Sequence, residues 1–375
     1  MNRFVYLDNN ATTKVGSHIK EKIMPYLELQ YGNPSSLYMH GKKIKDDIRS
    51  ARSYCEDLIN APKDSVIFTG SGSESNCSAF NSSIQQYENK KRIITTRVEH
   101  SSILEYCYLL EKKGFDVIYL DVDSNCKISI EQLESVVNDD TCLVSIQFAN
   151  NEVGTVIVDD EVINKIKDLK SKYDFNFHVD CVQGLGKIGI DVEKIGADLV
   201  SFSGHKIHCP KGIGMLYIKN KEVFTPLVTG HQEFNLRGGT ENVIGIVAMG
   251  ESCRYIKENF EDIMTKIKNI NKYLEEQLLT IPGVRINCCT VSRIPNTTSV
   301  TFENHIGNNV MFKLESVGVC VSTGSACNSE SSEPSYVLTS MNVVNPQNTI
   351  RVSVDENTTK SQVDYFIEHL KSIIE

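Results

Sequence analysis

Val200-Ser201-Phe202-Ser203-Gly204-His205-Lys206 is the stretch from which the fold of this chain can be worked out. Five apolar or small residues lead into a polar turn that ends in Lys206, and a second apolar run follows at 215–218. This pattern predicts strand, turn and strand, with the lysine on the turn. A lysine at the end of a buried strand loses hydration, which favours its neutral amine and permits a Schiff base. Taken alone, such a lysine is more typical of a protein surface.

Strands and helices alternate before this stretch. Apolar runs that predict strands lie at 66–69, 92–96, 117–120, 143–146 and 176–179, with helical segments between them. Such alternation predicts an α/β fold with a mostly parallel sheet covered by helices on both faces. After about Asn242 a long helical segment leads into shorter mixed elements, which predict a smaller α+β domain. We expect a large domain at 14–255 and a small domain at 256–375 that also contains 1–13.

Composition excludes several classes of protein. Forty per cent hydrophobic and 23% charged residues in 375 are typical of a globular protein, and the net charge of −9 argues against nucleic-acid or anionic-membrane binding. No apolar run is long enough to cross a membrane, and residues 1–8 lack the apolar core of a signal peptide. Twelve cysteines without a C-x-x-C pair or a zinc pattern predict mostly free thiols in a reducing cytoplasm.

The segment 69–75 predicts a strand, a Gly- and Ser-rich turn and a helix start. Gly70 and Gly72 allow close approach of the backbone, Ser71 and Ser73 supply hydroxyls, and a helix N-terminus supplies N–H donors. These are the parts of an anion site. The segment does not match a nucleotide P-loop. An ordinary helix start with serine caps is the alternative.

Asp180 ends the predicted strand before the one that leads to Lys206. In an open α/β sheet, ligands bind at this edge, and a carboxylate there can pair with a protonated ring nitrogen. The alternative for Asp180 is a helix N-cap. A lysine, a carboxylate and an anion site together are what pyridoxal 5′-phosphate (PLP) requires of a protein.

The chain also resembles the cysteine desulfurases of the NifS/IscS type, within the class V aminotransferase superfamily of PLP fold type I. The matching motifs, which extend over nearly the whole length, are YLDNNATT at 6–13, YGNPSS at 31–36, GSESN at 72–76, EH at 99–100, NNEVG at 150–154, HVD at 178–180, SGHK at 203–206, RGGTEN at 237–242 and SAC at 325–327. The resemblance implies a mostly parallel seven-stranded sheet flanked by helices, with a smaller α+β C-terminal domain.

The resemblance also implies roles toward the cofactor. Lys206 would form the Schiff base, Asp180 would pair with the ring nitrogen, and Gln183 would donate to the ring hydroxyl. His100 would stack on the ring and act as an acid or base, with Asn151 on the cofactor side. The phosphate would be held by Gly72, Ser73, Ser203 and His205, and by Thr240 from the other subunit of a homodimer.

For the substrate, the resemblance implies that L-cysteine is bound by Asn33 and Arg351, and that a guanidinium clamps its carboxylate. Cys327 lies in a small, polar segment that favours exposure, which suits a thiol that carries sulfur away. The resemblance makes it the persulfide-forming cysteine. Sulfur would then pass to an iron–sulfur scaffold or a tRNA-thiolation enzyme. The alternatives are a selenocysteine lyase, another class V lyase or aminotransferase, and a non-catalytic assembly protein.

Overall fold

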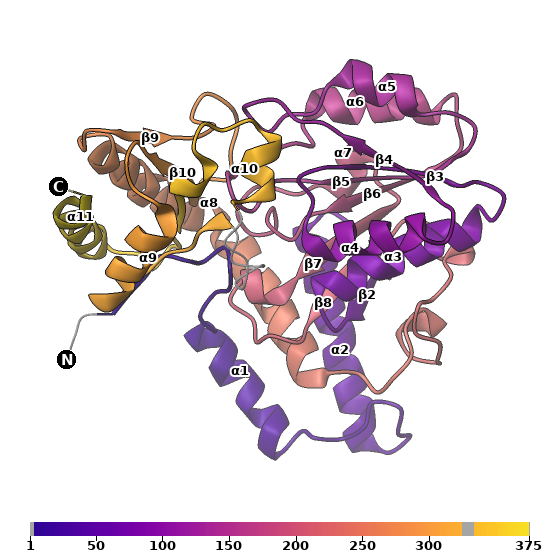
Figure 1. The fold of residues 1–375 in the computed structure, drawn as a ribbon. Coiled ribbons are helices and arrows are strands. Elements are labelled where there is room, and N and C mark those ends of the chain that lie inside the picture. The colour runs from indigo at the N-terminus through magenta and orange to yellow at the C-terminus, as the bar shows by residue number, and fades with distance from the viewer. Residues whose placement is uncertain (1–3, 325–333, 375) are drawn as a thin grey trace.

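The structure is a computed structural model that describes residues 4–324 and 334–374. Its largest part is built around a central sheet of seven strands. The strands follow the order β2-β8-β7-β6-β5-β3-β4, and only β8 runs antiparallel to its neighbours. They are β2 Val66–Thr69, β3 Arg92–Thr96, β4 Asp116–Leu120, β5 Thr141–Gln147, β6 Asn176–Asp180, β7 Leu199–Ser203 and β8 Gly214–Ile218. This confirms the predicted mostly parallel sheet (Figure 1).

Both faces of this sheet are covered, because apolar side chains alternate along its strands. In β2, Val66 and Phe68 join the large core that includes residues of α2 and α8, whereas Ile67 packs with Ala79 of α3 on the other face. The helices of this part are α1 Ser17–Glu28, α2 Met39–Leu58, α3 Gly72–Gln86, α4 Ser101–Glu111, α5 Ile130–Val136, α6 Asp160–Lys170, α7 Val192–Ile195 and α8 Val243–Leu278, with short 3-10 turns η1 Gly204–Lys206, η2 Lys221–Val223 and η3 Glu233–Asn235.

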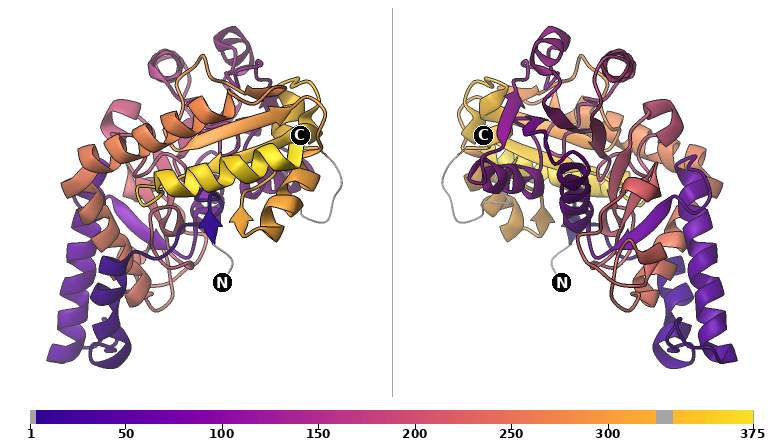
Figure 2. Two further views of the ribbon diagram at one scale, coloured as in Figure 1. Left: turned by 90° about the vertical axis from the view of Figure 1, so that its left-hand side faces the viewer. Right: turned by 90° about the vertical axis from the view of Figure 1, so that its right-hand side faces the viewer.

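The C-terminal part adds two small sheets. Strands β9 Val284–Ile286, β10 Thr297–Phe302 and β12 Thr349–Ser353 form an antiparallel sheet, with β10 in the middle. Strand β1, Val5–Tyr6, pairs in parallel with β11, Val319–Cys320, so the N-terminal segment belongs structurally with the C-terminal part. The remaining elements are α9 Gly307–Ser316, α10 Tyr336–Ser340, η5 Pro346–Asn348 and α11 Lys360–Ile374. Figure 2 shows α11 alongside the end of α8.

Helix α8 joins the two parts. It spans 36 residues, and its one non-helical residue is Asn259, with φ −120° and ψ 15°. Its first half packs against α1 and α2, and its second half contacts β9, β10 and α11. These contacts support our proposal of a large domain at 14–255 and a small domain at 256–375 with 1–13.

Two further expectations can be compared with the described residues. Within them, no helix has the length and apolar content that a membrane crossing needs. The eleven cysteines that the structure describes are all free, as the sequence predicted, and most of them are buried. The twelfth, Cys327, lies outside the described residues.

Candidate active site

One cavity of about 340 Å³ lies where the central strands end. Asp180 and Ser203 are the last residues of β6 and β7, and Gly72 begins the helix that follows β2. The carboxyl ends of parallel strands therefore deliver side chains that are distant in sequence to one edge of the sheet. The cavity is lined by ten of the residues that the sequence predicted: Gly72, Ser73, His100, Asn151, Asp180, Gln183, Ser203, His205, Lys206 and Arg351.

Lys206 reaches this cavity from a tight turn. Strand β7 ends at Ser203, the 3-10 turn η1 follows, and β8 returns antiparallel beside β7. The turn requires glycine at 204, because a Cβ there would lie 2.7 Å from Cγ2 of Ile213. The amine of Lys206 donates to the main-chain oxygens of Asn10 and Ala11, each at 2.7 Å. The N-terminal segment thus holds the lysine at the edge of the cavity.

Asp180 presents a buried carboxylate that accepts two hydrogen bonds. Its Oδ1 accepts from the N–H of Val182 at 2.9 Å, and its Oδ2 accepts from the side-chain amide of Asn76 at 2.8 Å. In the described chain, turns rather than a helix follow Asp180 directly, so the helix N-cap alternative is wrong. The two hydrogen bonds fix the orientation of this carboxylate at the edge of the cavity.

His100 lines the cavity and also caps helix α4. Its Nδ1 accepts a hydrogen bond from the N–H of Ser102 at 3.1 Å, which leaves the ring proton on Nε2. Burial lowers the pKa of His100; the charge of Lys206 lowers it further, and the charge of Asp180 opposes both. A neutral imidazole with an Nε2 proton can stack on an aromatic ring and donate a hydrogen bond.

The N-terminus of α3 forms one end of the cavity. Ser71 caps this helix by accepting from the N–H of Glu74 at 3.1 Å, so the N–H groups of the first turn are directed outward. Gly72 is required here, since a Cβ would lie 2.8 Å from Cγ2 of Val182 and 3.2 Å from Cβ of Ser203. Helix dipole, hydroxyl and close backbone approach are features that suit an anion such as a phosphate.

His205 stands at the same end and hydrogen-bonds through Nδ1 to the hydroxyl of Thr12 at 3.2 Å. Burial lowers its pKa to about 4, and the charges of Lys206, Lys211 and Lys187 act in the same direction. A bound phosphate would oppose this shift, because a nearby anion favours the charged imidazole.

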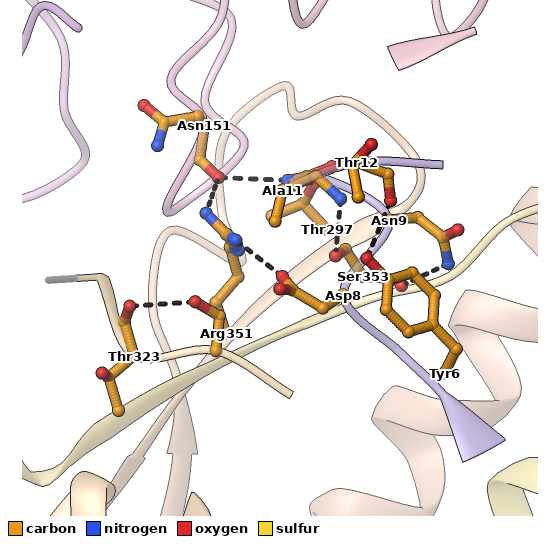
Figure 3. Close-up of polar contacts among 12 residues, drawn as sticks. Tyr6, Asp8, Asn9, Ala11, Thr12, Asn151, Thr297, Thr323, Arg351 and Ser353 are labelled. Atoms are coloured by element: carbon orange, nitrogen blue, oxygen red, sulfur yellow. Dashed lines mark hydrogen bonds and ion pairs between the residues drawn. The ribbon is translucent and has the colours of Figure 1, made fainter. Parts of the chain in front are cut away.

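Arg351 enters from β12 and is 5% exposed (Figure 3). Its guanidinium donates to Oδ1 of Asp8 at 2.7 Å and to the main-chain oxygen of Asn151 at 3.1 Å. The buried Nε has no partner among the described residues. In Figure 3 the amide of Asn151 points away from the guanidinium. An arginine with one carboxylate partner and a spare buried donor suits the capture of a second carboxylate.

Three predicted residues are not placed in the cavity. Asn33 is exposed in the loop between α1 and α2, where its side chain accepts from the N–H of Ser35 at 2.9 Å. Thr240 is exposed beside a separate hollow of about 200 Å³ that Gly70 and Arg237 also line. Cys327 lies outside the described residues. Gly324, three positions before it, lines the cavity.

Four residues of the site had no role assigned from the sequence. Asp8 pairs with Arg351, Asn76 bonds to Asp180, and Asn10 accepts from Lys206. Lys187 is buried and bonds to Gln183. Asp8 and Asn10 lie in the YLDNNATT motif at 6–13, and Asn76 lies in the GSESN motif at 72–76. Their place in these motifs could have indicated a role in the site. Lys187 follows a Gly-Leu-Gly segment and carried no signal.

Comparisons with known proteins agree with this geometry. The model of the aminotransferase class-V family matches residues 5–366. A cysteine desulfurase of Nostoc sp. is 40% identical over 375 residues, which cover 99% of this chain and 93% of that protein. A solved NifS-like protein superposes with a TM-score of 0.92 at 34% identity and covers 99% of both chains. SspA in complex with cysteine has a TM-score of 0.83 at 31% identity, over 95% of this chain and 100% of that one.

The fold and the cavity define a PLP-type enzyme of fold type I, and the chain belongs to the aminotransferase class-V family. Within that family, these relatives group it with the cysteine desulfurases.

Proposed function

We propose that this enzyme is a cysteine desulfurase that uses PLP to convert L-cysteine to L-alanine and transfers the sulfur to Cys327. The observation that carries the proposal is the meeting of Lys206, Asp180 and the N-terminus of α3 around one cavity. Its named relatives act on cysteine or were solved with cysteine bound, which supports the choice of substrate.

The donor set fits the cofactor. The helix start at Gly72 suits the phosphate, with the Ser203 hydroxyl beside it, and Asp180 would offer its carboxylate to the ring nitrogen. Lys206 lines the same cavity and supplies the amine for covalent attachment. When bound, PLP supplies an electron sink for the carbanion that forms at Cα of the substrate.

Three side chains of this protein would bind the substrate and transfer protons. Arg351 would bind the substrate carboxylate, which would replace part of the contact between Arg351 and Asp8. The amine of Lys206 would take the Cα proton, since general bases act at hydrogen-bond distance from the proton. The Nε2 proton of His100 is available to a leaving or developing anion at the same cavity.

Sulfur transfer would use Cys327. Its thiolate attacks the substrate sulfur, a new S–S bond forms, and the C–S bond breaks with its electron pair left on carbon. Protonation of that carbon skeleton yields alanine, and Cys327 keeps the persulfide. An acceptor thiol then attacks the outer sulfur and leaves Cys327 as a thiolate. We propose an iron–sulfur scaffold or a tRNA-thiolation enzyme as the acceptor.

A homodimer accounts for the two exposed predicted residues. Thr240 lines a separate hollow rather than the cavity of its own chain, and the proposed phosphate contact is to the other subunit. Large apolar side chains are exposed around the α1–α2 connection, namely Met24, Leu27, Leu29, Tyr31, Leu37, Tyr38 and Met39. Several large apolar side chains exposed within one short segment are typical of a protein interface. This segment also contains the loop of Asn33, which we propose as a substrate contact across the dimer.

The cysteines that the structure describes are all free, which supports our proposal of a cytoplasmic location.

The test is Cys327→Ala measured with a thiol reductant present. We expect the visible absorption of the bound cofactor to remain and to change on addition of cysteine, while alanine and sulfide release fall by about a thousandfold or more. Cys289→Ala, at an exposed cysteine, is the control and should keep wild-type rates. Unchanged alanine release in Cys327→Ala would overturn the assigned role. Faster turnover of selenocysteine than cysteine, without need of Cys327, would favour a selenocysteine lyase.

A further inference from the structure

Lys187 is a buried lysine that the proposed mechanism does not use. It is 6% exposed, and among the residues that the structure describes no carboxylate lies within ion-pair distance of its amine. Buried lysines are rare without such a partner, because removing the ammonium from water is costly. The position therefore requires an explanation in terms of what the amine contacts.

The amine of Lys187 donates to the side chain of Gln183. Its Nζ lies 2.6 Å from Oε1 of Gln183 and 3.4 Å from Oδ1 of Asn10. A lysine ammonium offers only donors, so the amide atom that faces it must be the oxygen. The NH2 group of Gln183 is thereby directed to the other side, where it donates to the main-chain oxygen of Asn10 at 3.1 Å. The second amide hydrogen has no acceptor among the described residues.

Gln183 separates Lys187 from the active-site cavity. Gln183, Asn10 and Lys206 line that cavity, whereas Lys187 lines a smaller neighbouring hollow. Asn10 is 1% exposed and accepts from Lys206 through the same main-chain oxygen that accepts from Gln183. Lys187, Gln183 and Lys206 are therefore linked through two amide groups.

We propose that Lys187 is a positioning residue for the reaction: its amine fixes the side-chain amide of Gln183 so that the NH2 group serves the cofactor cavity. This inference rests on the proposed function, in which Gln183 donates to the ring hydroxyl of the cofactor. Without Lys187 only the main-chain oxygen of Asn10 would hold the amide in this orientation, and a flip would turn an oxygen toward the ring oxygen.

The surroundings of Lys187 oppose its charge. Burial lowers the pKa of Lys187 well below its ordinary value, and the charges of Lys206 and Arg351 act in the same direction. Oε1 of Gln183 and Oδ1 of Asn10 are the acceptors that the amine has in this setting. Lys187 does not line the cofactor cavity, so its effect on the cofactor would pass through the amide of Gln183.

The test is a pH titration of the visible absorption band of the holoenzyme. A donor to the ring hydroxyl favours the deprotonated chromophore, so its loss raises the pH of the transition. We expect Lys187→Met to raise this pH by about 0.5 to 1 unit, the equivalent of one net hydrogen bond. Gln183→Leu should give a similar shift, and adding Lys187→Met to Gln183→Leu should add nothing. Lys170→Met, at a half-buried lysine paired with Asp198 far from the cavity, should leave the transition at its wild-type pH.

The outcomes separate this inference from the function on which it rests. A wild-type protein that shows no visible cofactor band would overturn the proposed function. A wild-type band with no shift in Lys187→Met, or with additive shifts in the double variant, would overturn the positioning role alone. If Lys187→Met does not fold, Lys187→Gln retains a donor and decides the question: the proposal requires its transition to lie between those of wild type and Gln183→Leu.

Discussion

The amine of Lys206 lies 2.7 Å from the main-chain oxygen of Asn10, although the two residues are 196 positions apart in sequence. This contact joins the loop after β7 to the segment that follows β1. The same segment supplies Asp8 to Arg351, so both ends of the cavity depend on it. The main-chain oxygens of Asn10 and Ala11 both accept from the amine of Lys206, so the segment after β1 sets its position in the cavity.

Lys206→Ala should abolish both cofactor attachment and turnover. We expect loss of the visible band and a fall in kcat of at least about a thousandfold, because attachment and the proton at Cα both depend on this amine. Absorption spectroscopy and alanine release provide the measurement. Lys211→Ala, at an exposed lysine in the following turn, is the matched control. A retained band in Lys206→Ala would show that another amine binds the cofactor.

Arg351→Gln should weaken substrate binding more than it slows the chemical steps. Losing a bidentate contact with a carboxylate should raise KM for cysteine by about 10- to 100-fold, with a smaller fall in kcat. Steady-state kinetics on both parameters checks this. Arg285→Gln, at an exposed position of β9, should behave as wild type. An unchanged KM would contradict the assignment of Arg351 as the carboxylate clamp.

Glu233→Gln should destabilise the fold without touching the cavity. The carboxylate of Glu233 accepts twice from Arg52, at 2.7 and 2.8 Å, and once from the N–H of Phe68, and both charged side chains are buried. Breaking a buried pair from one side leaves an uncompensated charge, which costs about 3 to 5 kcal/mol. Urea unfolding measures the loss. The exposed Glu258, changed to Gln, should alter stability by no more than about 0.5 kcal/mol.

The pair of His208 and Glu356, 3.3 Å apart, should make stability depend on pH. Burial opposes the charge of His208, but the hydrogen bond and charge of Glu356 and the carbonyl of Lys14 raise its pKa above 6.5. This contribution is complete below about pH 6.5 and is lost as pH rises through the raised pKa. The pKa of Glu356 is lowered below 4.5: burial raises it, but the hydrogen bond and charge of His208 outweigh burial. Its contribution is complete above about pH 4.5 and is lost as pH falls through the lowered pKa.

Glu356→Gln should therefore lower Tm most at about pH 5.5, where both groups are charged, by roughly 1 to 2 °C. The difference from wild type should shrink as the pH rises above that of the His208 transition. Thermal unfolding followed by circular dichroism over a range of pH checks this. A Tm difference that does not vary with pH would contradict the ion pair. Glu368→Gln, at an exposed position of α11, serves as the control.

The sequence predicted the sheet and most of the cavity because strand periodicity is local. Asp180 and Ser203 end their strands, and parallel strands place such residues at one edge. The contact between Asp8 and Arg351 could not be predicted in this way, because it joins residues 343 positions apart. Lys187 follows Gly186 in a turn, where local patterns predict an exposed lysine. Its burial depends on the packing of the N-terminal segment against the turn. The domain boundary that we propose at 255/256 has no break in secondary structure to mark it, because α8 continues through it.

The pairing of β1 with β11, and of Asp8 with Ser353, affects how the protein is made. The residues that hold Lys206 and Arg351 leave the ribosome long before their partner strands. During synthesis β1 stays without its partner strand until more than three hundred further residues have been made, since β1 begins at residue 5 and β11 at residue 319. A chain released before β11 would contain Lys206 and the N-terminus of α3 but not the strands that dock residues 5–13. Residues 5–13 can therefore take their place beside Lys206 and Arg351 only once β11 and β12 have been made.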